Sequence, residues 1–200
     1  MPACSIWRTP MNQILRYQFT VDDFARMVEA GIFSEDDRVE LIDGEVRIMS
    51  PTGARHAGII KRIIGIFRKR LNLDLVLGVH DPIQLDDYTE PQPDISVSRP
   101  RHDFYEQSHP GPADILLVIE VADSSLAYDR DEKIPRYARA PIPEAWLVDL
   151  AGETLAQYSA PREGEYREVR LLRSGDRLVS AAVQDLELGI DEIFAISGGV

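Results

Sequence analysis

One acidic residue lies inside the most apolar segment of the chain. The run Ile115-Leu-Leu-Val-Ile-Glu-Val121 has the length and composition of a central strand covered on both faces, and Glu120 is its only charged residue. A buried carboxylate costs several kcal/mol unless it is paired, protonated or bound to a metal, so Glu120 needs a partner. Asp94 is the best candidate, because it follows Pro93 at the start of another short apolar segment.

Two carboxylates on neighbouring strands would supply the oxygen ligands that Mg²⁺ prefers, with water and a phosphate completing the octahedron. An ion held by Asp94 and Glu120 would activate that water and neutralise charge developing on the phosphate. The same residues also fit a second interpretation, in which Glu120 forms a salt bridge at a strand end and Asp94 caps a turn. The residue types alone leave both interpretations open.

Sulfur and imidazole ligands are sparse. Cys4 is the only cysteine, which excludes an internal disulfide and a thiolate cluster. The four histidines are scattered, with no HExxH or other close pair. We expect surface or capping roles for His56, His80, His102 and His109. The sequence therefore favours an oxygen-ligated Mg²⁺ or Mn²⁺ over zinc.

A basic segment stands out in an acidic chain. The net charge of −12 opposes a large nucleic-acid footprint, because lysine and arginine supply most non-specific affinity for phosphate. Residues 46–73 nevertheless contain no acid and these basic residues: Arg47, Arg55, Lys61, Arg62, Arg68, Lys69 and Arg70. An anionic partner would have to dock on this segment, and we expect Lys61, Arg62, Arg68 and Lys69 to face it. A solvated surface that balances the acidic remainder is the alternative.

Hydrophobic spacing and turn residues predict an α/β domain. A helix is expected over about 20–30, a hairpin over 39–46 around Asp43-Gly44, and a basic amphipathic helix over about 60–71. Short strands should follow at 75–79, 83–85 and 95–97, then the central strand, a helix over 131–139, a strand at 144–150 and hairpin segments at 154–158 and 166–172. We expect one domain over residues 1–200. The short apolar runs and the absence of a signal-peptide pattern predict a soluble, cytoplasmic protein with no membrane contact.

A set of short motifs follows in a fixed order along the chain. They are Glu40-Leu-Ile-Asp-Gly, His56, Pro93-Asp94, Val118-Ile-Glu-Val121, Lys133, Tyr137-Ala138 and Trp146-Leu-Val-Asp149. This ordered set resembles that of the Uma-two family, within the PD-(D/E)XK superfamily of nucleases, and the resemblance covers about residues 17–191. It implies a restriction-endonuclease-like fold, in which helices flank a mixed central β-sheet and β-hairpins are added at the C-terminal end.

The resemblance also implies an activity, Mg²⁺-dependent hydrolysis of phosphodiester bonds in DNA. Asp94 and Glu120 would be metal ligands, with the backbone carbonyl of Val121 as a further ligand and Glu40 as an additional acid at the same site. His56, at the opening of the basic helix, would contact phosphate or cap the helix. A homodimer would be a natural way to cut both strands.

Two departures from the superfamily pattern concern its lysine. The position two residues after Glu120 holds Ala122, where the superfamily has lysine. The resemblance offers Lys133 on the following helix instead, because a long ammonium side chain can reach a shared site from another element. A solvated helix lysine is the alternative. Pro135 must lie in the first turn of that helix or kink it, because further in it would remove a backbone hydrogen bond.

Two other functions compete with the nuclease. A catalytically inactive nuclease fold would serve as a nucleic-acid-binding or protein-interaction module, which the acidic total and the displaced lysine favour. Glu40 and Glu120 would alternatively form an acid/base pair for a sugar substrate, but the chain lacks the signals of an aromatic-rich cleft. The retained Asp94, Glu120 and Lys133 favour the enzyme.

Overall fold

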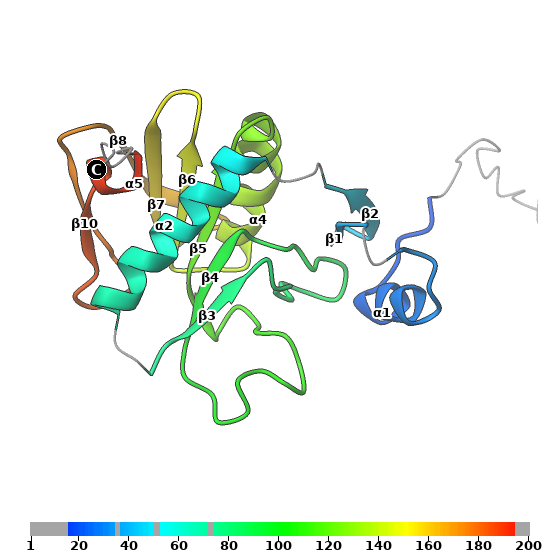
Figure 1. The fold of residues 1–200 in the computed structure, drawn as a ribbon. Helices are drawn as coiled ribbons and strands as arrows, with labels where there is room; N and C mark the ends of the chain where they lie inside the picture. Colours follow the sequence, from blue (N-terminus) through cyan, green and yellow to red (C-terminus); the bar gives the residue numbers. More distant parts are fainter. Residues whose placement is uncertain (1–15, 35–36, 50–52, 72–73, 195–200) are drawn as a thin grey trace, which may run out of the picture.

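The computed structural model describes residues 16–34, 37–49, 53–71 and 74–194 of the 200-residue chain. Its main feature is a six-stranded mixed sheet in the order β3-β4-β5-β6-β7-β8 (Figure 1). The strands are β3 (Val76–Val79), β4 (Ile95–Ser98), β5 (Ile115–Ala122), β6 (Glu144–Asp149), β7 (Thr154–Arg162) and β8 (Glu165–Leu172). Strands β5 and β6 run parallel, and the other neighbours are antiparallel. This confirms the expected mixed α/β fold.

Strand β5 is the centre of the sheet, as its apolar composition predicts, and all eight of its residues are buried. Parallel pairing with β6 requires a crossover connection, which helices α3 (Leu126–Tyr128), η1 (Asp129–Lys133) and α4 (Ile134–Arg139) provide. Helix α2 (Ala54–Arg70) lies across the opposite face (Figure 1). Alternate residues of β5 therefore meet different helices, with Ile119 and Val121 in the cluster under α2 and Val118 and Ala122 in the cluster under α4.

The crossover helix differs from the expected one, which began at residue 131. Its helical residues start at Leu126, and η1 is a π-helical turn in which the Ile134 N–H donates to Asp129 O. Pro135 lies in the first turn of α4, directly after η1. A proline has no N–H to continue the ladder, and a wider turn is one of the recognised ways in which helices accommodate such an interruption.

The expected strand at 83–85 is absent, which corrects that prediction for this described segment. Ile83 and Leu85 are buried, but their N–H groups donate to Pro91 O and Thr89 O within a local loop. Prolines at 82 and 91 flank this loop and cannot donate to a ladder. Strands β7 and β8 are longer than the segments predicted from the sequence.

Helix α1 (Val21–Glu29) and the hairpin of β1 (Val39–Ile42) and β2 (Glu45–Ile48) form as expected. Thr20 caps α1 in a capping box with Asp23. Asp43 and Gly44 both have positive φ, the requirement of the tight hairpin turn. Leu41 pairs with Glu90, which ties the hairpin to the loop before β4.

The C-terminal part adds the hairpin of β9 (Arg177–Val179) and β10 (Glu187–Gly189), followed by α5 (Ile190–Phe194). Buried Glu144 at the start of β6 accepts hydrogen bonds from the Ala181 and Ala182 N–H groups and holds this segment to the sheet. Within the described ranges, no helix is long and apolar enough to cross a membrane. Cys4 lies outside the described residues.

Candidate active site

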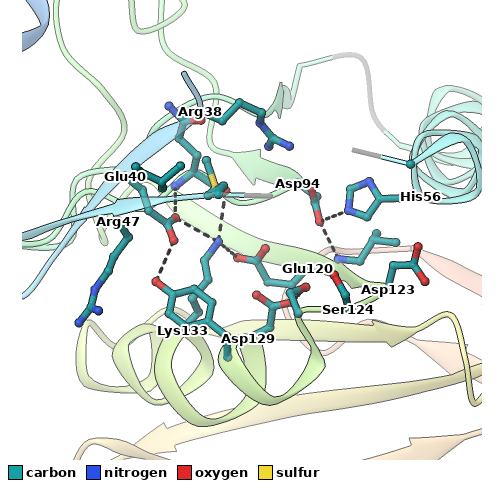
Figure 2. Close-up of a pocket in the computed structure, with 17 residues that line it drawn as sticks. Arg38, Glu40, Arg47, His56, Asp94, Glu120, Asp123, Ser124, Asp129 and Lys133 are labelled. Atoms are coloured by element: carbon teal, nitrogen blue, oxygen red, sulfur yellow. Dashed lines mark hydrogen bonds and ion pairs between the residues drawn. The ribbon is translucent and has the colours of Figure 1, made fainter. Parts of the chain in front are cut away.

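Glu120 lies between Val118 and Ala122 on β5, and residues two apart on a strand point to the same face. Because Val118 and Ala122 pack under α4, Glu120 also faces the crossover helix. The residue is only 3% exposed. Its Oε1 atom lies 2.8 Å from Lys133 Nζ (Figure 2). The same atom accepts a 2.5 Å hydrogen bond from the Tyr137 hydroxyl. The partner that a carboxylate in an apolar strand requires is therefore a lysine from the next helix.

Asp94 directly precedes β4, whose register sets Ile95 opposite Ile119, so Asp94 lies beside the end of β5. Its Oδ2 atom accepts the Val121 N–H at 2.8 Å and lies 3.1 Å from His56 Nε2. The Nδ1 atom of His80 lies 3.4 Å from Oδ1. Asp94 is thus a buried carboxylate between two strands, with two imidazole rings beside it.

Lys133 ends η1 and is 3% exposed, so it is not a solvated helix lysine. Besides Glu120, its Nζ atom contacts Glu40 Oε2 at 3.3 Å and donates to Gln92 O at 3.2 Å. Figure 2 shows this amine between the two carboxylates. The structure therefore brings together Glu40, Glu120 and Lys133 from a hairpin, the central strand and the crossover helix.

Glu40 is fully buried on β1. The Tyr128 hydroxyl donates to its Oε1 at 3.0 Å, and the Gln92 N–H donates to its Oε2 at 3.1 Å. With the ammonium of Lys133, these contacts satisfy both carboxylate oxygens. Glu40 therefore holds the lysine in place from the side away from Glu120.

The charges in this cluster depend on burial. Burial raises the pKa of Glu120 to about 8, against the opposing charge of Lys133. Burial alone would lower the pKa of Lys133, but the carboxylates of Glu120, Glu40 and Asp129 outweigh it and raise that pKa. The lysine therefore stays protonated and acts as a hydrogen-bond donor and positive charge.

Asp94 behaves differently from Glu120. Burial alone would raise the pKa of Asp94, but the contacts from His56 and Val121 and the charge of Lys133 hold it below its usual value. The Asp94 carboxylate is therefore ionised at neutral pH. Two neighbouring acids thus differ in their readiness to carry charge.

These side chains line a cavity of about 380 Å³. Among the described residues around it are five carboxylates and three cationic side chains: Glu40, Asp94, Glu120, Asp123 and Asp129, with Arg38, Arg47 and Lys133. The excess of acids and the hard oxygen donors suit a divalent cation of the Mg²⁺ class. His56 Nδ1 is buried and has no hydrogen-bond partner within the described ranges.

Within the described part of the chain, no three Asp, Glu, His or Cys side chains are placed so that together they could hold a metal ion. That arrangement is compatible with Mg²⁺, which proteins usually hold with one or two carboxylates and leave partly bound to water and substrate phosphate. Asp94, Glu120 and Val121, the ligands expected from the sequence, all line this cavity.

The predicted DNA-facing residues lie on α2. Lys61, Arg68 and Lys69 are exposed on this helix. Arg62 is half-buried, and its guanidinium donates to Ile193 O at 2.7 Å, so it joins α2 to α5. His56 is the residue of the predicted substrate-binding set that reaches the cavity.

Comparison with known proteins gives the family. The family model of Uma2, described as “Putative restriction endonuclease”, matches residues 21–191. The chain belongs to the Uma2 family. The Uma2 chain is also similar to a crystal structure described as a “putative nuclease belonging to DUF820” from Anabaena variabilis ATCC 29413. The two share 18% sequence identity and a TM-score of 0.68, with 88% of this chain and 97% of that chain covered, which shows a common fold. No curated protein matches the chain.

The sequence alone does not predict a functional role for several residues of the Uma2 site. Tyr128, Asp129 and Gln92 belong to helix or loop segments without a distinctive pattern, and His80 was expected at the surface or in a cap. Tyr137 belongs to a family motif, but its bond to Glu120 depends on the returning helix. For most of these residues, only the tertiary fold reveals the role.

Proposed function

We propose that this Uma2 protein is a Mg²⁺- or Mn²⁺-dependent endonuclease that hydrolyses phosphodiester bonds in DNA. The observation that carries the proposal is the convergence of Asp94, Glu120 and Lys133 in one cavity of a chain that belongs to this family. Lys133 lies thirteen positions after Glu120 in sequence (133 − 120), yet its amine is 2.8 Å from the carboxylate. It thereby takes the place of the lysine that Ala122 does not provide.

The proposed roles follow from these positions. Asp94, Glu120 and the Val121 carbonyl would hold the ion, which when bound lowers the pKa of a water molecule and neutralises charge on phosphate. Lys133 would orient the attacking water and stabilise negative charge on the phosphate oxygens, since its ammonium donates and cannot accept. In the net reaction the water oxygen bonds to phosphorus, the bond from phosphorus to the sugar oxygen breaks, and that oxygen takes up a proton.

We further propose that α2 helps to hold the DNA, because Lys61, Arg68 and Lys69 are exposed on it. Reversing these three residues and Arg62 to glutamate should abolish a gel shift, and the affinity of the unmodified chain should fall steeply with salt. Undiminished binding by this variant would refute the assignment. Arg62→Glu alone serves as a folding control, because that side chain bonds to α5.

Nicking of supercoiled plasmid DNA tests the activity. The purified chain should nick DNA in Mg²⁺ or Mn²⁺ and not in EDTA, and Glu120→Gln or Asp94→Asn should abolish nicking. Glu168→Gln is the matched control, because Glu168 is an exposed strand carboxylate on β8. Failure of the unmodified chain to nick any DNA with either ion, or full activity of Glu120→Gln, would overturn the proposal.

A binding or interaction module is the second candidate. The observation that favours it is that Lys133 already pairs with both Glu40 and Glu120, as a lysine with a structural role would. This alternative predicts DNA or protein binding that needs no ion and survives Glu120→Gln. For the enzyme we propose a homodimer that cuts both strands, which a light-scattering mass in solution would test.

A further inference from the structure

The hairpin of β1 and β2 carries two arginines at the cavity, Arg38 and Arg47. Arg38 directly precedes β1, and its carbonyl accepts the Met49 N–H. Side chains alternate along extended backbone, so Arg38 and Glu40, two residues apart, lie on one face. The hairpin register sets Glu40 opposite Arg47, and directly opposite residues of an antiparallel pair share a face. Arg38, Glu40 and Arg47 therefore all line the cavity, with the guanidinium of Arg47 at its outer edge (Figure 2).

The two arginines differ in depth from Glu40. Glu40 is fully buried, whereas Arg38 is half-buried and Arg47 is exposed. Arg38 contacts His80 Nδ1 at 3.1 Å, and His80 lies beside Asp94. The hairpin thus places its carboxylate at the floor of the cavity and its guanidinium groups toward the rim.

Among the described residues, the ion-pair partner of Arg47 is an exposed side chain. Its guanidinium donates to Glu45 at 2.6 Å, but the two side chains are 46% and 41% exposed. Exposed pairs of this kind contribute about 0–1 kcal/mol, so a phosphate can displace the glutamate at little cost. A guanidinium also matches phosphate with two parallel hydrogen bonds, which an ammonium cannot do.

We infer that Arg38 and Arg47 bind the phosphate groups of the nucleic-acid backbone on either side of the bond that is cut. This inference rests on the proposed function. A polyanion must approach a cavity with an excess of carboxylates, and cations at its rim offset that repulsion. The residues of α2 would then hold more distant phosphates, while the hairpin sets the position of the backbone over Asp94 and Glu120.

The test measures fluorescence anisotropy of a short labelled DNA duplex in Ca²⁺, which takes the same oxygen ligands as Mg²⁺. Arg38→Met and Arg47→Met should each weaken binding about tenfold or more. Each should also make the slope of log affinity against log salt shallower by about 0.9, the value for one lost phosphate contact. Arg47→Lys should keep the slope, since it keeps the charge.

Arg167→Met is the matched control. Like Arg47, Arg167 is a strand arginine that pairs with a glutamate two residues earlier, and its side chain is 44% exposed. It should leave both affinity and slope unchanged. A melting curve for every variant establishes that the compared proteins are equally folded.

The inference is overturned if the unmodified chain binds no duplex, or if folded Arg38→Met and Arg47→Met keep its affinity and slope. Nicking by the same preparations separates this result from the proposed function. DNA binding that depends on the arginines, without any nicking, would refute the proposed nuclease activity and support the phosphate site of Arg38 and Arg47. Nicking that neither substitution affects would support the nuclease activity and refute the phosphate site.

Discussion

Replacing Tyr137 by phenylalanine should loosen Glu120 without disturbing the core. Tyr137 is fully buried, and its hydroxyl donates to Glu120 Oε1 at 2.5 Å. A hydrogen bond to a charged group contributes about 1.5–3 kcal/mol, and one between neutral groups about 0.5–1.5 kcal/mol. Because burial raises the pKa of Glu120 to about 8, much of this carboxyl is protonated at neutral pH without the ion. We therefore expect the free energy of unfolding to fall by about 1–2 kcal/mol.

The effect on the ion should be larger than the effect on the fold. Groups that orient a metal ligand typically contribute 10–100-fold to metal affinity, so Mn²⁺ should bind Tyr137→Phe about 10–100 times more weakly. Isothermal calorimetry measures this affinity, and urea denaturation measures the stability. Tyr137 would act through Glu120, as a positioning residue.

Tyr166→Phe provides the matched control. The Tyr166 hydroxyl donates to the neutral carbonyl of Ile142 at 2.9 Å, so its loss should cost about 0.5–1.5 kcal/mol of stability. Ion affinity should stay unchanged. Equal Mn²⁺ affinity in Tyr137→Phe and the unmodified chain, or an equal loss in both tyrosine variants, would refute the positioning role.

Three further predictions concern buried charges. Lys133→Met should lower hydrolysis by roughly 10² or more and the free energy of unfolding by about 3–5 kcal/mol, because the buried carboxyl groups of Glu40 and Glu120 both lose the ammonium that pairs with them; unchanged nicking would contradict the role of the ammonium. Burial raises the pKa of Glu90 against the opposing charge of His109, so the stability it contributes is present at low pH and is lost as the pH rises through the raised pKa. Glu90→Gln should thus raise the melting temperature at neutral pH and change it little at about pH 4, and an equal shift at both would contradict this. Glu144 accepts five hydrogen bonds within the described residues. In Glu144→Gln an amide NH₂ replaces one carboxylate oxygen and leaves two donors unpaired, so the free energy of unfolding should fall by about 2–6 kcal/mol. A fall below about 0.5 kcal/mol in urea denaturation would contradict this prediction.

Local patterns were sufficient for much of the fold. The period of 3.6 identifies α2, the Asp43-Gly44 dipeptide identifies the hairpin, and the apolar run identifies β5. The crossover helix was predicted too short because the π-helical turn and the short α3 have no hydrophobic period of their own. The strand expected at 83–85 failed because hydrophobic residues also occur in buried loops.

Only part of the candidate site could be predicted from the residues themselves. Glu120 was recognisable from a carboxylate in an apolar strand, and Asp94 was proposed as its partner. Lys133 and Glu40 required the family resemblance, because a returning helix and a hairpin bring them to the site. The position of Arg47 beside Glu40 could have been predicted from the sequence, since counting across the hairpin turn sets the two residues opposite each other.

Anomalous diffraction from crystals soaked in Mn²⁺ tests the central claim most directly. The account predicts one strong peak in the cavity, within bonding distance of an Asp94 oxygen, a Glu120 oxygen and the Val121 carbonyl. Crystals of Asp94→Asn with Glu120→Gln should lack that peak. A peak elsewhere, or none at saturating Mn²⁺ in the unmodified chain, would contradict the account.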